Sequence, residues 1–160
     1  MLRQLLGSPI GCLGRTCRDW VRDRSGATAV EFALVGPPLL MMLFGIVGFG
    51  LTLNNYLELT DGVRSGARAF AIGRSTASPY TVATNAIYGS AVSLTQASIT
   101  VTLKVNGTTC ATDSACSTAL NAAPGGAASV TATYPCSINI MGIDYAPSCT
   151  LTSQTTNLIE

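Results

Sequence analysis

The chain has 160 residues, of which 48% are hydrophobic and only 11% are charged, against about 25% charged residues in an average soluble domain. Nine basic and eight acidic residues leave a net charge of +1, which gives no indication of nucleic-acid binding. There is no histidine, so histidine acid–base catalysis, every triad that needs histidine and the commonest metal ligand are excluded. The composition therefore favours a protein that is not an enzyme and has no cofactor or metal site.

Residues 1–26 form a basic leader. Five arginines stand against two aspartates, which leaves this segment with a charge of +3. Its apolar residues follow neither a helical nor a strand period, and glycine and proline interrupt them. Because basic flanks of membrane helices stay in the cytoplasm, this leader predicts a cytoplasmic N-terminus.

The next segment is apolar over a length that can cross a membrane. Val30 to Leu53 is 24 residues with a single charge, that of Glu31. As a helix it rises about 36 Å, against a hydrocarbon core of about 30 Å. The apolar core of a cleaved secretory signal has only about 7–15 residues, and the rest of the chain is too small and polar to bury such a helix. The sequence predicts one membrane-spanning helix, with the C-terminal part across the membrane.

Prolines and glycines modify this helix. Pro37 and Pro38 each remove a backbone donor, so we expect a break or bend of the helix around them. Gly45, Gly48 and Gly50 lack side chains and permit close packing against another helix, although ordinary membrane helices also contain glycines.

Glu31 is out of place in an apolar helix. A carboxylate at the middle of a membrane costs about 3 kcal/mol on insertion scales, and less near the interface. Either its side chain reaches the headgroups from one turn inside, or it has a cationic partner. Cleavage after Gly26 would make Ala27 the first residue and expose an α-amino group, with an ordinary pKa of about 8, as that partner.

The residues around Gly26 resemble the processing site of type IV prepilins and pseudopilins. Gly26 follows a basic leader, Glu31 is the fifth residue after it, and Phe32 and an apolar run follow. The wider pattern is similar to the TadE-like family, minor pilin or pseudopilin components of the Tad (tight adherence) type IV pilus and secretion system. The stretches that carry this similarity are ATAVEFALV, PPLLMMLFGIVGFG and VRSGARA.

The resemblance implies a function in pilus assembly, adhesion and secretion. It implies a pilin-like fold, cleavage after Gly26 by a prepilin peptidase, and pairing of Glu31 with the α-amine of a neighbouring subunit. Its partners would be other pilin-like subunits, the inner-membrane assembly platform and the lipid bilayer. The protein would span the bacterial inner membrane once, with its C-terminal domain in the periplasm or incorporated into a pilus. The alternative is an uncleaved single-pass anchor of the same machine.

The helix is expected to continue beyond the membrane to about Ile72, with Gly73 as its C-cap. Asp61 and Arg64 are three residues apart and can pair, whereas Arg64 and Arg68 are four apart and repel each other. The two arginines either anchor the helix at headgroup level or contact a neighbouring subunit.

The sequence predicts three parts: a leader at 1–26, a transmembrane helix that continues beyond the membrane at 27–73, and a small α+β domain at 74–160. A helix is expected over residues 79–92. Alternating apolar and polar residues predict antiparallel strands at 99–105, 130–134 and 150–158, and Asn106-Gly107 predicts a hairpin turn.

Cysteines are expected to stabilise this domain, because it contains few large apolar residues. Four cysteines in an oxidising compartment form two disulfides, with three possible connectivities. Local pairing, Cys110 with Cys116 and Cys136 with Cys149, is favoured because each pair closes a loop rich in turn residues. Closing a loop of about 14 residues is worth close to 3 kcal/mol. Cys12 and Cys17, in the leader, have no assigned role.

A membrane-tethered hydrolase is the alternative from a different functional class. It would use Asp113, Asp144 or a serine, although the sequence has no motif with paired carboxylates. The glycine-rich stretch at 123–127 lacks the lysine of a phosphate-binding loop, and no C-x-x-C spacing indicates a metal or redox site.

Overall fold

The computed structural model describes residues 25–140 and 142–160. The expected leader, with Cys12 and Cys17, lies outside the described residues apart from its last two positions. The chain divides into two compact units, Met1–Leu43 and Phe44–Glu160, and each is considered by itself.

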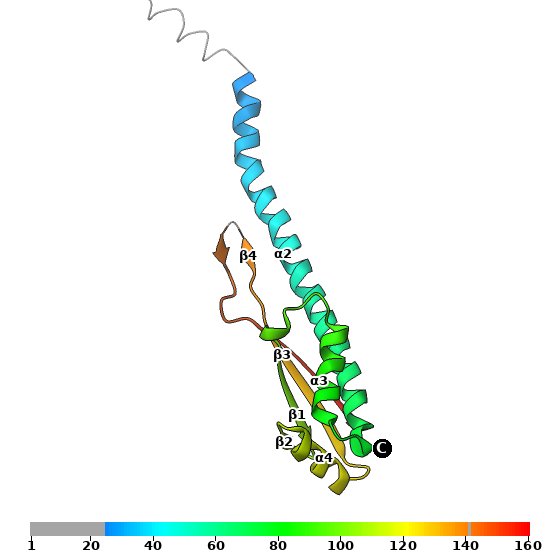
Figure 1. Cartoon of the computed structure of the whole chain (residues 1–160). Coiled ribbons are helices and arrows are strands. Elements are labelled where there is room, and N and C mark those ends of the chain that lie inside the picture. The colour runs from blue at the N-terminus through cyan, green and yellow to red at the C-terminus, as the bar shows by residue number, and fades with distance from the viewer. Residues whose placement is uncertain (1–24, 141) are drawn as a thin grey trace, which may run out of the picture. The chain divides into compact units, whose positions relative to one another are not determined.

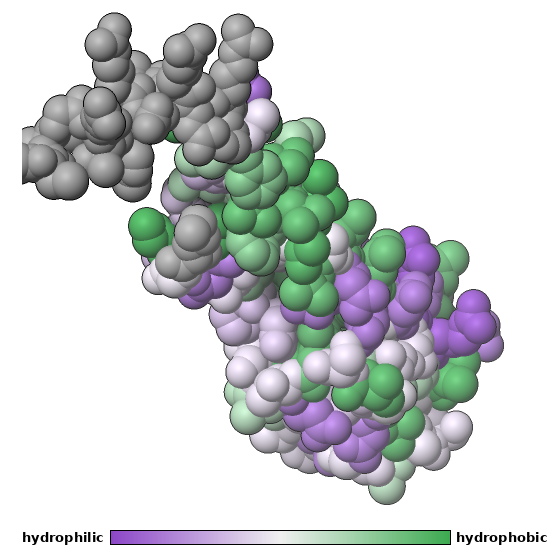
Figure 2. All heavy atoms as spheres, turned by 90° about the horizontal axis from the view of Figure 1, so that it is seen from above, coloured by the Kyte–Doolittle hydropathy of each residue, from purple (hydrophilic) through white to green (hydrophobic). Residues whose placement is uncertain are grey.

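A single helix, α2 (Ser25–Ala71), covers 47 residues (Figure 1). Its most apolar 18-residue window has a mean hydropathy of 2.1, and none of that window is buried inside the protein. A core helix of a soluble protein would be mostly buried, so this helix fits the single membrane span that the sequence predicts. Figure 2 shows hydrophobic side chains gathering over α2.

The helix is not broken at Pro37 and Pro38, where the sequence predicts a break or a bend, and the bend stays a prediction. Both prolines lie inside α2, which is helical on either side of them. Proline has a fixed φ in the helical range, so it removes a hydrogen bond to the carbonyl four residues earlier without forcing the chain out of the helix. The two prolines thus remove the partners of two carbonyls, those of Ala33 and Leu34, and the helix continues.

The C-terminal end of α2 also differs from the expectation. The helix ends at Ala71, and Gly73 begins a short 3₁₀ helix, η1 (Gly73–Ser75), instead of capping α2 in a left-handed conformation. Glycine is needed here for close approach, because a Cβ at Gly73 would lie 3.0 Å from the Cβ of Pro79. The Gly73 carbonyl accepts hydrogen bonds from the backbone N–H and the hydroxyl of Thr76, at 3.1 and 2.7 Å.

An antiparallel sheet follows, accompanied by short helices. The elements after η1 are α3 (Pro79–Ser90), η2 (Gln96–Ser98), β1 (Thr100–Val105), β2 (Thr108–Cys110), α4 (Asp113–Ala122), β3 (Ala127–Pro135), β4 (Asn139–Ile140), β5 (Ile143–Asp144) and β6 (Thr150–Leu158). Four strands form one sheet in the order β2-β1-β3-β6, and β4 and β5 form a separate hairpin. The architecture is α+β, as the sequence predicts.

The predicted strands appear within a few residues of their expected bounds. The turn between β1 and β2 has positive φ at Asn106 (47°) and Gly107 (86°), the backbone that a two-residue hairpin turn requires. Helix α4 is not among the elements predicted from the sequence. Its signals are local: the Thr112 hydroxyl accepts a hydrogen bond from Ala115 N–H at 3.3 Å, and the buried Cys116 and Leu120 lie one turn apart.

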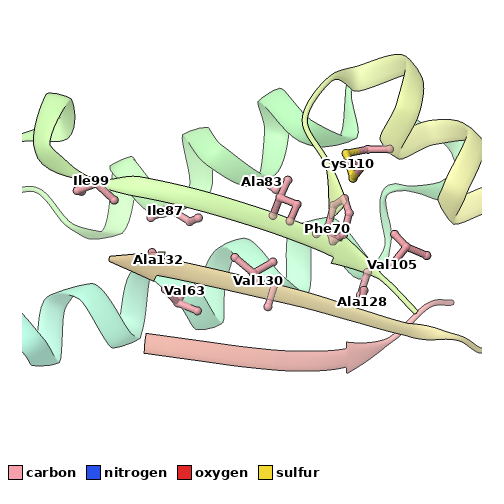
Figure 3. Packing of buried hydrophobic residues seen from close by; sticks show 14 of the residues in the cluster. Val63, Phe70, Ala83, Ile87, Ile99, Val105, Cys110, Ala128, Val130 and Ala132 are labelled. Carbon is pink, nitrogen blue, oxygen red and sulfur yellow. A yellow bond between two sulfur atoms is a disulfide. The ribbon is translucent and has the colours of Figure 1, made fainter. Parts of the chain in front are cut away.

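The end of α2 belongs to the core of the second unit. Its buried side chains lie under α3 and one face of the sheet, where residues of β3 alternate between buried and half-buried (Figure 3). The buried hydrophobic residues of α2 are Leu59, Val63, Ala67, Phe70 and Ala71. The C-terminal domain therefore has no separate core of its own, because one wall of that core is the helix that precedes it.

Helices α2 and α3 approach each other at two glycines. A Cβ at Gly62 would lie 3.0 Å from the Ile87 carbonyl oxygen. A Cβ at Gly66 would overlap Cγ1 of Ile87 and lie 3.0 Å from the Ala83 carbonyl oxygen. Backbone atoms cannot move aside as the end of a side chain can, so a side chain at position 66 pushes the two helices apart.

We predict that Gly66→Ala destabilises the second unit. Overpacking a core costs about 1–3 kcal/mol, more than the roughly 1 kcal/mol that alanine gains over glycine inside a helix. Gly89→Ala in α3 is the matched control, since a Cβ there meets nothing within 4 Å. Denaturant unfolding of the full chain in detergent should show a lower midpoint for Gly66→Ala and an unchanged or higher one for Gly89→Ala; equal midpoints would contradict the close helix contact.

Candidate functional site

The predicted cleavage site lies at the start of α2. Gly26 is the second residue of the helix, and both Gly26 and Ala27 are exposed. A Cβ added at Gly26 would meet no atom within 4 Å, and φ at this position is not positive. Glycine inside a helix costs about 1 kcal/mol relative to alanine, so neither packing nor backbone conformation explains glycine at this position.

Glu31 is exposed on the surface of the same helix. Within the described residues it has neither a salt bridge nor a hydrogen-bond partner. Ala27 and Glu31 are four residues apart, so they lie on one face of the helix, one turn from each other. The Glu31 carboxylate thus lies on the same face of the helix as Ala27. Cleavage after Gly26 would make Ala27 the N-terminal residue.

Phe32 is 76% exposed, and its ring lies 3.8 Å from the position of a Cβ on Gly36. It covers Gly36, which is buried although the positions around it are exposed. The apolar residues that follow are also exposed, which leaves an apolar helix surface that this unit does not cover by itself.

The three glycines expected to permit helix packing differ in their surroundings. Gly45 and Gly48 are half-buried against the β4–β5 hairpin, whereas a Cβ at Gly50 would meet nothing within 4 Å. Two of the three therefore face a segment of their own chain. A role in packing against helices of other subunits stays a prediction.

Arg64 and Arg68 lie on the exposed side of α2. With Ser65, Ala69 and Ile72 they line an open depression of about 420 Å³. The two guanidinium groups make this depression positively charged. Arg64 also lies 3.5 Å from Asp61, a pair with side chains 68% and 71% exposed. Such a pair is worth about 0–1 kcal/mol, so it is not needed to hold the fold and leaves both arginines accessible.

Both predicted disulfides are present. Cys110 at the end of β2 is bonded to Cys116 in α4, which attaches that helix to the edge of the sheet. Cys136 is bonded to Cys149, and the Cys136 N–H donates to the Cys149 carbonyl at 3.1 Å. This second disulfide closes the base of the segment that carries the β4–β5 hairpin.

The two aspartates of the hydrolase alternative are not brought together. Asp113 begins α4, whereas Asp144 is in β5, and Figure 1 shows α4 and β4 toward opposite ends of the main sheet. Asp144 accepts a hydrogen bond from Ala146 N–H at 2.9 Å within its own turn. Among the described residues there is no group of three or more histidine, cysteine or acidic side chains that could hold a metal ion.

Asp113 connects two helices. Its carboxylate accepts hydrogen bonds from the Thr81 hydroxyl at 2.7 Å and from the Thr81 N–H at 2.9 Å, joining the start of α4 to the start of α3. The Thr81 hydroxyl, followed by the Thr81 backbone N–H, lowers the pKa of Asp113 below its ordinary value. These contacts indicate a structural carboxylate.

Comparison with known proteins identifies one segment of the chain. Residues 26–68 match the model of the family described as TadE-like protein. The match contains the glycine, the acidic residue, the prolines and the post-membrane arginines considered above. No curated protein and no solved structure matches the chain.

We predict that Asp113 stabilises the fold above its unfolded pKa of about 3.9 and loses that contribution as the pH falls through its lower folded value. Asp113→Asn should be less stable than the wild type at neutral pH, with the difference shrinking in acid. Thr81→Val should act in the same direction, because it removes the hydroxyl donor.

Thr118→Val is the control, since the Thr118 hydroxyl bonds only to the Ser114 carbonyl inside α4. The measurement is the free energy of unfolding from pH 7 down to acid for all four proteins. A difference between wild type and Asp113→Asn that is constant with pH would contradict the role given to the carboxylate.

Proposed function

We propose, for a chain whose residues 26–68 are TadE-like, that the protein is a pseudopilin-like minor component of a Tad-type pilus assembly and secretion machine. The family associates the chain with Tad pili and with a structural rather than an enzymatic role, and its one apolar N-terminal helix fits a single-pass membrane protein. The observation that carries the finer proposal is that Gly26, Ala27 and Glu31 are all exposed at the start of this helix.

Processing by a prepilin peptidase is supported by the glycine itself. The fold does not require glycine at position 26, as its open surroundings show. Recognition by a protease would explain the glycine at this position, because a residue without a side chain lets the peptide backbone approach an active site closely. The basic residues before it would keep the leader in the cytoplasm, where the peptidase would meet it.

Assembly would then use the charge pair that cleavage creates. The new α-amino group of Ala27 is largely protonated at neutral pH, given its ordinary pKa of about 8. Pairing with Glu31 of an adjacent subunit would neutralise both charges in an apolar environment, where an unpaired carboxylate is costly. The exposure of Glu31 and the absence of a partner for it among the described residues support this pairing between subunits.

The remaining parts of the chain fit the same arrangement. Residues 27–73 would form the helix in the inner membrane and beyond it, and residues 74–160 would be the periplasmic domain. Both disulfides lie on that side, and disulfides persist in the oxidising periplasm. The partners would be other pilin-like subunits and the inner-membrane assembly platform, and Arg64 and Arg68 would contact such a subunit from their accessible side of α2.

We predict that Gly26→Asp blocks cleavage. The uncut protein should be larger by about 2.7 kDa, which is 26 residues at a mean mass of about 103 Da for this chain of 16.5 kDa. Gly14→Asp, which adds the same charge inside the leader, should still be cut. The measurement is the intact mass and N-terminal sequence of protein recovered from host cells.

A wild-type protein that starts at Met1 would exclude processing and favour the uncleaved anchor of the same machine. A wild-type N-terminus other than Ala27 would move the cleavage site and remove Glu31 from the fifth position.

We predict that Glu31→Ala leaves cleavage intact and reduces incorporation into pili, because the α-amine of Ala27 then stays unpaired in an apolar environment. Glu31→Gln should have the same defect, since it keeps the size of the side chain and removes its charge. Glu31→Asp should restore part of the assembly. Pilus fractions sheared from cells report the incorporated protein, and normal amounts for Glu31→Gln would contradict the charge pair.

A further inference from the structure

The segment between Cys136 and Cys149 is a defined hairpin that projects from the main sheet (Figure 1). Its two strands pair Asn139 with Asp144 and Ile140 with Ile143. The Tyr145 N–H donates to the Ile138 carbonyl at 2.9 Å, which extends the ladder by one more bond. The Cys136–Cys149 disulfide closes this segment at its base, and we call its described residues, 136–140 and 142–149, the 136–149 hairpin.

The 136–149 hairpin packs on α2 at two glycines. A Cβ at Gly48 would lie 3.8 Å from Cγ2 of Ile138, and a Cβ at Gly45 would lie 4.0 Å from Cδ1 of Ile140. Both isoleucines are half-buried by this contact. The absence of side chains at the two glycines lets the hairpin lie against the helix surface, so the contact fixes the height of the hairpin along α2.

That height corresponds to the outer end of the membrane span. About 20 helical residues cross a hydrocarbon core of roughly 30 Å, so a span that begins at Val30 ends near Phe49. Gly45 and Gly48 lie in the last turn and a half of this span. Around them α2 exposes further large apolar side chains, and the first polar residue after them is Thr52. These apolar residues are Phe44, Ile46, Val47 and Phe49.

The face of the hairpin that packs on α2 extends beyond this contact as an exposed apolar surface. Directly paired residues of two antiparallel strands share a face, so Ile143 and Tyr145 lie beside Ile140 and Ile138, and they are 60% and 62% exposed. The opposite face carries the pair Asn139 and Asp144. The single charged residue between positions 136 and 149 is Asp144, whose carboxylate is bound by Ala146 N–H inside the turn. The exposed apolar surface of α2 therefore continues onto the hairpin without an intervening charge.

We propose that the 136–149 hairpin is a membrane-interface anchor, with Ile143 and Tyr145 inserted among the lipid headgroups of the leaflet from which α2 emerges. The partner is the lipid itself. Tyrosine suits this depth, because its ring is apolar and its hydroxyl reaches water. A two-stranded ribbon also has unpaired backbone groups along both outer edges, and these cannot enter hydrocarbon. These backbone groups therefore hold the hairpin at the outer boundary of the hydrocarbon, level with Gly45 and Gly48, and oppose deeper insertion.

The anchor would limit the movement of the domain on the membrane. A helix alone leaves a domain free to tilt and rotate about its exit point. A second contact with the same leaflet, held to α2 by Ile138 and Ile140, fixes one face of the domain toward the bilayer. This proposal depends on membrane insertion of α2, and it depends neither on cleavage after Gly26 nor on assembly of a pilus.

Tryptophan fluorescence of the full chain in phosphatidylethanolamine–phosphatidylglycerol vesicles tests this anchor. The sequence has one tryptophan, Trp20, so Trp20→Phe provides a dark background. Tyr145→Trp and Ile143→Trp in that background are two independent reporters on different residues of the hairpin. Leu158→Trp is the matched control, because Leu158 is also largely exposed, at 71%, and lies at the opposite end of β6 from the hairpin.

We expect the hairpin reporters to emit at shorter wavelength than the control and to be shielded from iodide. A nitroxide placed near the lipid headgroup should quench them more than one near the end of the acyl chain, and neither nitroxide should quench the tryptophan at position 158. Thermal unfolding midpoints equal to that of the background protein show that each reporter is folded.

Two results would overturn the anchor. Hairpin reporters as accessible to iodide as the control would place the hairpin in water. Reporters shielded from iodide but insensitive to both nitroxides would mean that a second copy of the chain covers the hairpin instead of lipid. Neither readout involves a peptidase or a pilus, so an uncut N-terminus in cells would contradict the proposed function and leave this result standing.

Discussion

The side chains of α2 are buried by the rest of the chain only near the end of the helix, and the other features of the structure depend on this. From Leu59 to Ala71 the helix forms one wall of the core, packed against α3 and the sheet. Before that, its most apolar window is entirely unburied. At about 25 cal/mol per Å² of apolar surface, leaving such a helix in water is strongly unfavourable, and its length and hydropathy fit a membrane span.

Different segments pack closely on α2 at different glycines. Gly62 and Gly66 admit α3 so closely that backbone atoms lie at contact distance. Gly45 and Gly48 admit the 136–149 hairpin. Among the described residues, none lies within 4 Å of a Cβ at Gly26, which supports the proposal that an outside partner recognises this glycine. The same residue type thus serves helix packing, attachment of the hairpin and, as proposed, recognition by a peptidase.

Charged residues are scarce, and those of the described part have distinct local uses. Asp113 joins two helices through Thr81, Asp144 closes a turn, and Glu58 accepts hydrogen bonds from both the N–H and the hydroxyl of Ser93. Glu31 differs from these carboxylates because the described residues give it no such partner. A structural protein that assembles through its helix explains this distribution better than a hydrolase does, since a hydrolase needs carboxylates that converge on a pocket.

The local features could be predicted from the sequence, because hydropathy, periodicity and short loops indicate the apolar span, strands β1, β3 and β6, the Asn106-Gly107 turn and both disulfides. The TadE-like segment was also readable, because its motif is contiguous. Only the tertiary structure showed that Phe70 and Val63 belong to the core of the domain after them, that α2 runs through Pro37 and Pro38, and that the hairpin lies on Gly45 and Gly48. The core and the hairpin depend on contacts between residues far apart in the chain, which the pattern of one segment does not show. At the prolines, the free energy of the remaining helix outweighs the lost hydrogen bonds, and a short sequence pattern does not show this either.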